Sequence, residues 1–312
     1  MRFGSRRWKW DPRERGFSHK RFYGAADLSV LPREGLKRPR RPIENQGMTL
    51  RCTAYAGAVA NGYIHGLRFH PDWQAKKIGQ KQGRNVDDNG ADPKAAMSSL
   101  RDDGSLLLDL WPLNLANTSP EATANWSSYP DNLDKNAKDF CALAYFGVDD
   151  AFDLFDDIRY ALWKAYDPKT GKGAVVQAFS PWYLEWLNPA GTTPALVPGI
   201  VPTAYSTFAG YHAYAFVDWC EIGGVLHLIA QNSAGPNFGD KGFLYFPREV
   251  VNREFGKWGS ALKILKPMTP EQIALAKLET PAGRIQRLIL QAWYLLSEKF
   301  GAPFGRLFAR YA

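Results

Sequence analysis

Four side chains in this sequence have the types and the spacing of an acyl-transfer site. Cys52 stands six residues after Gln46, where the polar segment 45–51 gives way to a run of small apolar residues. The first N–H groups of a helix lack intrahelical partners and lie at the positive end of its dipole, so a thiolate placed there is stabilised. Thiols in such places have a pKa of roughly 3.5–7.5. The Gln46 amide could donate to an oxygen that becomes negative during the reaction.

The other two groups stand beside apolar segments far downstream. His212 comes 160 residues after Cys52 and precedes the apolar run 213–217, and Asn232 follows 20 residues later, after the run 225–230. An amide hydrogen-bonded to an imidazole holds the ring in one tautomer and one orientation. The spacing therefore predicts a thiol and an imidazole as nucleophile and base, with Asn232 orienting the base.

The elements that would position these residues can be predicted from apolar periodicity. Small apolar residues over 52–60 predict a buried helix, Asp92-Pro93 predicts a helix start that runs to about residue 104, and apolar residues at spacings of three and four predict a helix over 150–166. The polar segments 72–93 and 112–138 are interpreted as loops. Four short apolar runs predict strands, at residues 174–179, 213–217, 225–230 and 242–246. Helices first and antiparallel strands later indicate an α+β protein with two lobes.

Several segments, in the right order over roughly residues 25–255, resemble the papain family of cysteine peptidases and its divergent bacterial and phage members. The matching segments are Asn45-Gln46-Gly47 followed by Cys52, Gly210-Tyr211-His212-Ala213, Gln231-Asn232-Ser233, and Phe238-Gly239-Asp240 with Gly242-Phe243. The resemblance implies a helical lobe whose central helix starts at the nucleophile, an antiparallel β lobe and a cleft between them. It also implies peptide-bond hydrolysis by Cys52, His212 and Asn232, with Gln46 in the oxyanion hole and no cofactor.

The sequence departs from the family pattern at three positions. Thr53 stands where a Trp usually follows the nucleophile, and Thr49 stands where a disulfide-forming cysteine is usual. Ala234 replaces a Trp that usually shields the His–Asn hydrogen bond from water. We therefore expect the His212–Asn232 bond to be wetter than in the family.

Charge and the extent of the resemblance together divide the chain into three segments. Residues 1–41 hold 13 Lys/Arg against 4 Asp/Glu, a balance of +9, whereas the rest of the chain has a balance of −1. We interpret 1–41 as a basic arm that contacts an anionic partner or lies along the body. Residues 42–255 are the predicted peptidase domain, and 256–312 a helical C-terminal extension. Nucleic-acid binding as the main activity is disfavoured because the body is not basic.

The C-terminal extension carries apolar faces, which predict a protein partner or a fold-back onto the body. A helix predicted over 281–299 has one apolar stripe, and a second set follows residue 301: Phe304, Leu307, Phe308 and Tyr311. The alternative to an enzyme is a papain-fold structural or interaction component of a larger assembly, such as a virion, with catalysis weakened or lost. Thr53, Ala234, the tail and the basic arm favour that alternative, whereas the intact set of Cys52, His212, Asn232 and Gln46 favours the enzyme.

The remaining composition bears on the cellular compartment. The basic N-terminus has no apolar stretch after it and so is not a secretory signal, and no run of 18 apolar residues predicts a membrane span. The three cysteines, Cys52, Cys141 and Cys220, are too few and odd in number for a disulfide framework. A protein made in a reducing cytoplasm fits this pattern, with Cys141 and Cys220 as inert core residues.

Overall fold

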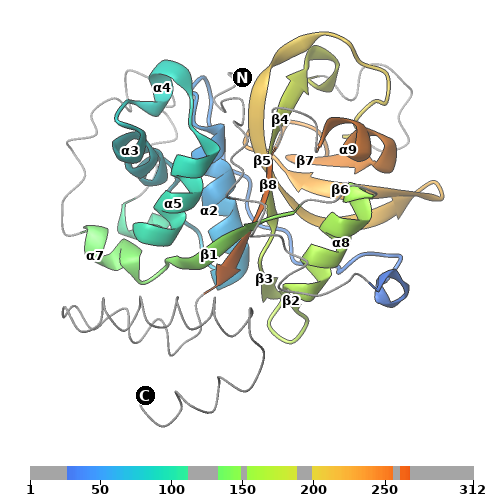
Figure 1. Ribbon diagram of the computed structural model, residues 1–312, viewed down its shortest axis with the longest axis horizontal. Coiled ribbons are helices and arrows are strands. Elements are labelled where there is room, and N and C mark those ends of the chain that lie inside the picture. The colour runs from blue at the N-terminus through green and yellow to red at the C-terminus, as the bar shows by residue number, and fades with distance from the viewer. Residues whose placement is uncertain (1–26, 112–132, 149–152, 188–198, 256–260, 268–312) are drawn as a thin grey trace.

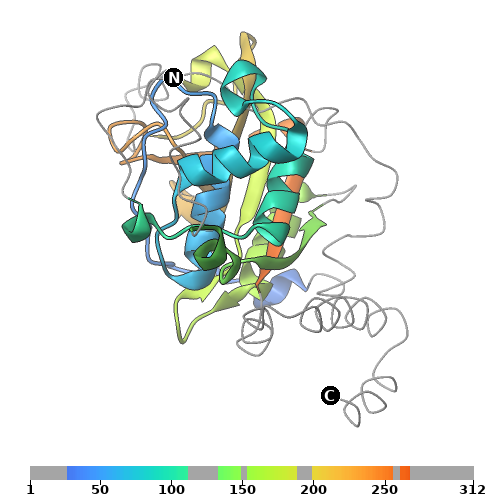
Figure 2. The same cartoon turned by 90° about the vertical axis from the view of Figure 1, so that its left-hand side faces the viewer.

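The computed structural model describes residues 27–111, 133–148, 153–187, 199–255 and 261–267 of the chain. In Figure 1 the helices α2 to α5 and α7 lie on one side, and strands β4 to β7 with α8 and α9 lie on the other. Figure 2 shows the helical side facing the viewer, with α2 behind the other helices of that side. The α-helices are α2 (Cys52–His65), α3 (Pro71–Gln82), α4 (Val86–Asn89), α5 (Pro93–Asp102), α7 (Leu133–Lys138), α8 (Leu154–Lys164) and α9 (Arg248–Glu254).

The central helix α2 forms because its sequence is short-chained and apolar. Almost all of its residues are buried, and a Cβ at Gly57 would lie only 3.3 Å from the Leu100 side chain, so α2 and α5 approach closely there. The helix ends at Gly66, whose φ of 78° is a left-handed conformation that glycine adopts without a steric penalty. The predicted helix starting at Asp92-Pro93 is confirmed as α5, with the Asp92 side chain accepting from the Lys94 N–H.

The prediction of a loop over residues 72–93 is wrong. Helix α3 begins at Pro71, capped by His70, whose Nδ1 accepts from the Trp73 N–H, and it ends at Gly83 with a φ of 70°. It is followed by the short α4. The segment is polar, yet α3 buries Trp73 and Ile78, so a few large apolar residues are enough to dock a largely hydrophilic helix.

The strand lobe is built on one antiparallel sheet of six strands, in the order β1-β8-β4-β5-β6-β7. The four predicted strands are confirmed as β4 (Val176–Tyr183), β5 (Phe208–Ile222), β6 (Val225–Gln231) and β7 (Phe243–Pro247), and the helix predicted over 150–166 is α8. Two strands of this sheet were not predicted. They are β1 (Ala142–Gly147) and β8 (Ala261–Pro267), and β8 pairs with both β1 and β4. The sheet thus extends beyond the predicted domain boundary at residue 255. A separate two-stranded ribbon joins β2 (Tyr166–Asp167) to β3 (Lys172–Gly173).

Part of the basic arm is built into the body. Asp218 on β5 accepts hydrogen bonds from the backbone N–H groups of Leu36 and Arg38, at 2.7 and 3.0 Å. The buried Arg38 guanidinium donates to the carbonyl oxygens of Leu162 and Ala174, and Arg40 pairs with Asp240. These cations of the arm are therefore engaged with the body itself.

Three predicted regions lie outside the described residues: the N-terminal part of the arm, 1–26, most of the predicted loop, 112–132, and the tail, 268–312. The partners predicted for the arm and the tail stay predictions. The end of the predicted loop is helix α7 (Leu133–Lys138), so the loop prediction is wrong there. None of the helices in the described part of the chain has both the length and the apolar character that a bilayer crossing needs.

Candidate active site

Cys52 is the first residue of α2, as the sequence predicted. Its thiol is completely buried, and its Sγ lies 4.0 Å from the Thr53 hydroxyl oxygen. The N-cap residue, Arg51, makes no side-chain hydrogen bond to the first turn. The N–H groups of Ala54 and Tyr55 both donate to the Arg51 carbonyl, so the Cys52 N–H lies ahead of the first intrahelical bonds. An amide in that position is suited to stabilise negative charge.

His212 and Asn232 meet in the strand lobe. His212 lies on β5, Asn232 directly follows β6, and His212 Nε2 is 2.8 Å from Asn232 Oδ1. The same oxygen accepts from the Ser233 N–H at 2.8 Å, which assigns it as the amide oxygen. Because a carbonyl oxygen only accepts, the proton lies on Nε2, and Nδ1 is the basic nitrogen of the neutral ring. The pair therefore has the tautomer that a general base at Nδ1 requires.

An aromatic cluster encloses the imidazole. The Trp182 ring on β4 stands edge-on to the His212 ring with centroids 4.7 Å apart, and both side chains are completely buried. Trp182 in turn packs on Trp186 at 5.3 Å and on Tyr214 at 5.5 Å. This burial lowers the pKa of His212 to about 4, against the opposing effect of the hydrogen bond to Asn232.

The expectation of a wet His–Asn bond is therefore wrong. Asn232 is only 2% exposed and His212 is not exposed at all. Ala234 provides no cover, but Trp182 reaches the ring from the neighbouring strand, since Ser180 and Trp182 of β4 pair with His212 and Gly210 of β5. No pattern in the sequence indicates that a tryptophan 30 residues before the histidine would lie against it.

Gln46 is held rigidly at the start of the segment that leads to Cys52. Its side-chain oxygen accepts from the Ser233 hydroxyl at 2.5 Å, and its Nε2 donates to the Thr49 carbonyl at 2.9 Å. Its backbone N–H donates to the Ser233 carbonyl at 2.9 Å, so Gln46 is tied to the residue that follows Asn232. The structure thus joins three of the predicted site residues, Gln46, His212 and Asn232, through hydrogen bonds at one end of the strand lobe.

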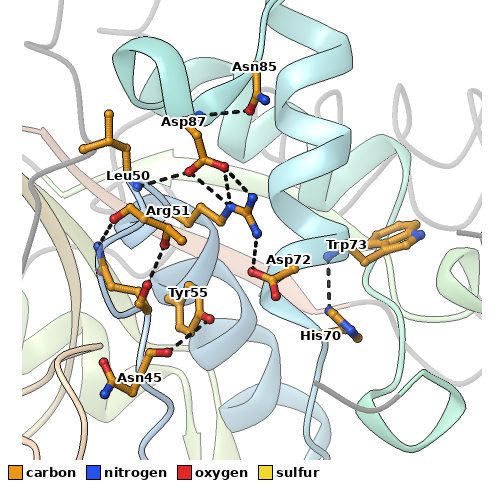
Figure 3. A network of polar contacts seen from close by, with 11 residues as sticks. Asn45, Leu50, Arg51, Tyr55, His70, Asp72, Trp73, Asn85 and Asp87 are labelled. Atoms are coloured by element: carbon orange, nitrogen blue, oxygen red, sulfur yellow. Dashed lines mark hydrogen bonds and ion pairs between the residues drawn. The ribbon is translucent and has the colours of Figure 1, made fainter. Parts of the chain in front are cut away.

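A charged network that was not predicted lies on the other side of Cys52. Figure 3 shows the Arg51 side chain reaching between Asp87 and Asp72. Arg51 Nε is 2.9 Å from an Asp87 oxygen, Nη1 is 2.9 Å from an Asp72 oxygen, and the guanidinium is completely buried. Burial alone would lower the pKa of Arg51, but the two carboxylates outweigh it and raise the pKa above its usual value.

Hydrogen bonds across the lobe boundary hold α2 against the sheet. Gln177 Nε2 on β4 donates to the Thr53 carbonyl at 3.0 Å, and the Tyr63 hydroxyl near the end of α2 donates to Gln231 on β6 at 3.0 Å. Helix α2 packs along β5, the strand that carries His212. The nucleophile candidate and the base candidate thus lie on elements with a fixed relation to each other.

Among the residues that the structure describes, the other cysteines offer no second site of this kind. Cys141 is buried, Cys220 is half-buried, and burial raises the pKa of Cys220 to about 11. Within the described ranges, no cluster of three His, Cys, Asp or Glu side chains is placed to hold a metal ion.

Comparison with solved structures identifies the fold. No protein-family model and no curated protein sequence matches the chain. Xylellain, a cysteine protease from Xylella fastidiosa, superposes with a TM-score of 0.67 at 20% identity, covering 86% of this chain and 96% of that one. Procathepsin B S9 from Trypanosoma congolense gives a TM-score of 0.52 at 17% identity over 73% of this chain and 72% of its own.

A third structure agrees with these two. The ragweed pollen cysteine protease Amb a 11, in its proform, gives a TM-score of 0.53 at 16% identity over 79% of this chain and 71% of its own. The chain has the papain-like fold, as the α+β arrangement of the sequence and its motifs predicted.

Proposed function

We propose that this protein is a cysteine peptidase that hydrolyses peptide bonds through an acyl-enzyme at Cys52. The observation that carries the proposal is the buried 2.8 Å hydrogen bond from His212 Nε2 to Asn232 Oδ1. This bond places the ring proton on Nε2, so Nδ1 is the nitrogen that can exchange a proton with the thiol. A Cys–His pair oriented by a third group is the usual arrangement for an activated thiol. The likeness to cysteine proteases, including the one from Xylella fastidiosa, supports the same activity.

In the first step, Nδ1 of His212 takes the thiol proton of Cys52, and the resulting thiolate attacks the carbonyl carbon of a peptide bond. An S–C bond forms, and the carbonyl oxygen becomes negative. The Cys52 backbone N–H and the Gln46 amide would donate to this oxygen, and an amide nitrogen has two hydrogens, of which the Thr49 bond uses one. His212 then passes its Nδ1 proton to the departing amine as the C–N bond breaks.

In the second step, water releases the acyl group. His212 takes a proton from the water molecule, the hydroxide adds to the thioester carbonyl, and the C–S bond breaks to regenerate the thiolate. The same two donors stabilise the second oxyanion. These steps use side chains of the chain alone, and the substrate class is a peptide or protein.

The proposal is tested with a peptide that carries a thiol-reactive electrophile, followed by intact mass measurement. The native protein should take one equivalent, Cys52→Ala should take none, and Cys220→Ala should match the native protein. Cleavage of a peptide library should follow the same order. Equal labelling of native protein and Cys52→Ala would overturn the proposal, and a native protein that neither takes the label nor cleaves would point to a scaffold role for the fold.

A further inference from the structure

The segment 46–52 carries both donors of the proposed oxyanion hole, one at each end. Gln46 provides a side-chain N–H and Cys52 a backbone N–H. Thr49 is buried and bound to Gln46 through its N–H, hydroxyl and carbonyl groups, so residues 46–49 form one turn, in which Met48 is 51% exposed and Gly47 has a φ of 58°. Leu50 and Arg51 join this turn to Cys52. The separation and direction of the two donors therefore depend on what holds the two ends.

The end at Gln46 is held by the strand lobe through Ser233, as described above. The end at Cys52 is held by Asp87 on α4. One Asp87 oxygen accepts from the Leu50 N–H at 3.2 Å, and the two Asp87 oxygens accept from Arg51 Nε at 3.2 and 2.9 Å. Asp72 on α3 accepts from Arg51 Nη1 at 2.9 Å. The two residues before the nucleophile are thus bound by one carboxylate.

Arg51, Asp87 and Asp72 form a clamp on the two residues before Cys52, and the burial of its charges makes this clamp stiff. The side chains of Arg51, Asp87 and Asp72 are 0%, 5% and 16% exposed. Both carboxylates lie in the first turn of a helix, where the helix dipole favours negative charge. A planar guanidinium held by carboxylates on two sides has a fixed orientation, which a single-point contact would not enforce.

The clamp acts on the peptide that carries a proposed donor. Arg51 is the N-cap of α2, and its carbonyl accepts from Ala54 and Tyr55. The Arg51–Cys52 peptide therefore has its carbonyl bound by the helix and its preceding side chain bound by Asp87. A turn of this peptide would direct the Cys52 N–H away from the substrate oxygen.

We infer that Asp87 is a positioning residue for the oxyanion hole, acting through the Leu50 N–H and the Arg51 guanidinium, with Asp72 as a weaker second support. The inference rests on the proposed peptidase function. It goes beyond the triad, because Asp87 contacts neither the substrate nor the thiol and lies on a segment that the sequence suggested to be a loop.

Two reactions of Cys52 separate positioning of the hole from general damage. Alkylation by iodoacetamide forms an S–C bond and expels iodide without forming an oxyanion, so it does not need the hole. Amide hydrolysis needs it. We expect Asp87→Asn to lower kcat/KM for a peptide amide by about 10- to 100-fold, less than the loss of a whole oxyanion donor, with the alkylation rate of Cys52 unchanged within error.

Matched variants make the test specific. Asp72→Asn should lower hydrolysis less than Asp87→Asn, because Asp72 has no bond to the Leu50 N–H. Asp156→Asn is the control, since Asp156 is 13% exposed, pairs with Arg159 and Arg248, and lies on α8, at the opposite end of the molecule from α4 in Figure 1. It should leave both reactions unchanged.

A double variant tests whether Asp87 acts on the oxyanion hole. Gln46→Ala combined with Asp87→Asn should lower kcat/KM by less than the product of the two single losses, because both changes act on one hole.

Three results would overturn the inference: equal loss of hydrolysis and alkylation in Asp87→Asn, an equal loss of hydrolysis in Asp156→Asn, or full hydrolysis in Asp87→Asn. Failure of the proposed function is recognised separately, as native protein with no Cys52-dependent hydrolysis. In that case, hydrogen exchange of the 50–52 amides decides. Faster exchange in Asp87→Asn than in Asp156→Asn supports the clamp, and unchanged exchange rejects it.

Discussion

The two sides of the candidate site are held by different forces. On the side of Cys52, a buried guanidinium binds two carboxylates that come from two other helices. On the side of His212, the contacts are aromatic: Trp182 lies against the imidazole, and Tyr214 stacks parallel on Phe246 with centroids 5.3 Å apart.

The two kinds of contact prepare the Cys52 amide and the His212 imidazole in different ways. Ion pairs depend on direction, so the Cys52 side fixes the orientation of peptide N–H groups. Edge-to-face packing of aromatic rings excludes water from the imidazole, so the His212 side sets the solvation of the ring, and with it the proton affinity. Removing one partner should therefore change the orientation of the peptide N–H groups on the Cys52 side, and the pKa of the imidazole on the His212 side.

The largest expected effect comes from opening the aromatic side. Trp182→Ala should destabilise the fold by about 3–5 kcal/mol, because it leaves a cavity in a fully buried cluster. It should also raise the pKa of His212 toward its usual value, because water would reach the ring. Denaturant unfolding measures the first effect, and the imidazole NMR shift with pH measures the second.

Trp73→Ala is the matched variant for this prediction. Trp73 is 1% exposed and packs in the helical lobe with Leu106 and Leu133. It should cost a similar free energy of unfolding and leave the titration of His212 in place. If Trp73→Ala shifts the His212 titration as much as Trp182→Ala does, the aromatic cluster has no special role in setting basicity.

The next effect concerns the orientation of the imidazole. Asn232→Ala removes the acceptor on Nε2, and a hydrogen bond to a group that becomes charged is worth about 1.5–3 kcal/mol, or roughly 10- to 100-fold in kcat/KM. Asn61→Ala is the control: Asn61 is equally buried, but its amide donates to Ser105 and to the Phe140 carbonyl in the helical lobe. Unchanged turnover in Asn232→Ala would mean that another group orients His212.

Acid should lower the free energy of unfolding, because the buried His212 and His70 take up protons less readily in the folded chain than in the unfolded one. Burial lowers the pKa of His212 to about 4, and burial with the nearby charge of Arg51 lowers the pKa of His70 to about 3. The unfolded chain binds these protons near pH 6.5, before the folded chain does. Each histidine should therefore cost about 1.4 kcal/mol of unfolding free energy per pH unit as pH falls below about 6.5, until its folded pKa is reached.

His70→Asn isolates the share of His70 in this effect, while His65 on α2, whose pKa burial also lowers to about 4, keeps its own share. Asparagine is a good N-cap and does not titrate, so it can accept from the Trp73 N–H as His70 does. The slope of the unfolding free energy against pH between about 6.5 and 4 should fall by the share of one histidine. An identical slope in native protein and His70→Asn would show that His70 is protonated at the same pH in the folded and unfolded chains.

The sequence predicted the local elements of the fold better than its long-range ones. Strands β4 to β7 were found because each is a compact apolar run, and three of them follow one another along the chain. Strand β8 was missed because its partners, β1 and β4, lie far upstream and its Lys residues mask the apolar alternation. Helix α3 was not predicted because its composition is polar, although Pro71 at its start and Gly83 just after its end are typical of helix boundaries.

The candidate site shows the same division. Gln46, Cys52, His212 and Asn232 were predicted from types and spacing. In the structure, His212 is hydrogen-bonded to Asn232, and Gln46 is joined to Asn232 through Ser233. Arg51 and Trp182 were overlooked, because an arginine or a tryptophan acquires its role only from its neighbours. Asp72 and Asp87 lay in a segment interpreted as loop, so the ion cluster could not be assembled from the sequence.

The last prediction concerns whether exposure or ionisation decides which thiol, Cys52 or Cys220, reacts first. Cys220 is half-buried and therefore easier to reach than Cys52, which has no exposed surface. Burial raises the pKa of Cys220 to about 11, so only about one molecule in 10⁵ has the Cys220 thiolate at pH 6. If His212 keeps Cys52 ionised, iodoacetamide at pH 6 should modify Cys52 before Cys220, as peptide mapping would show. His212→Ala should remove that advantage, because no base remains to take the thiol proton. A rate that follows exposure, with Cys220 first in the native protein and no change in His212→Ala, would show that access and not ionisation controls the thiol.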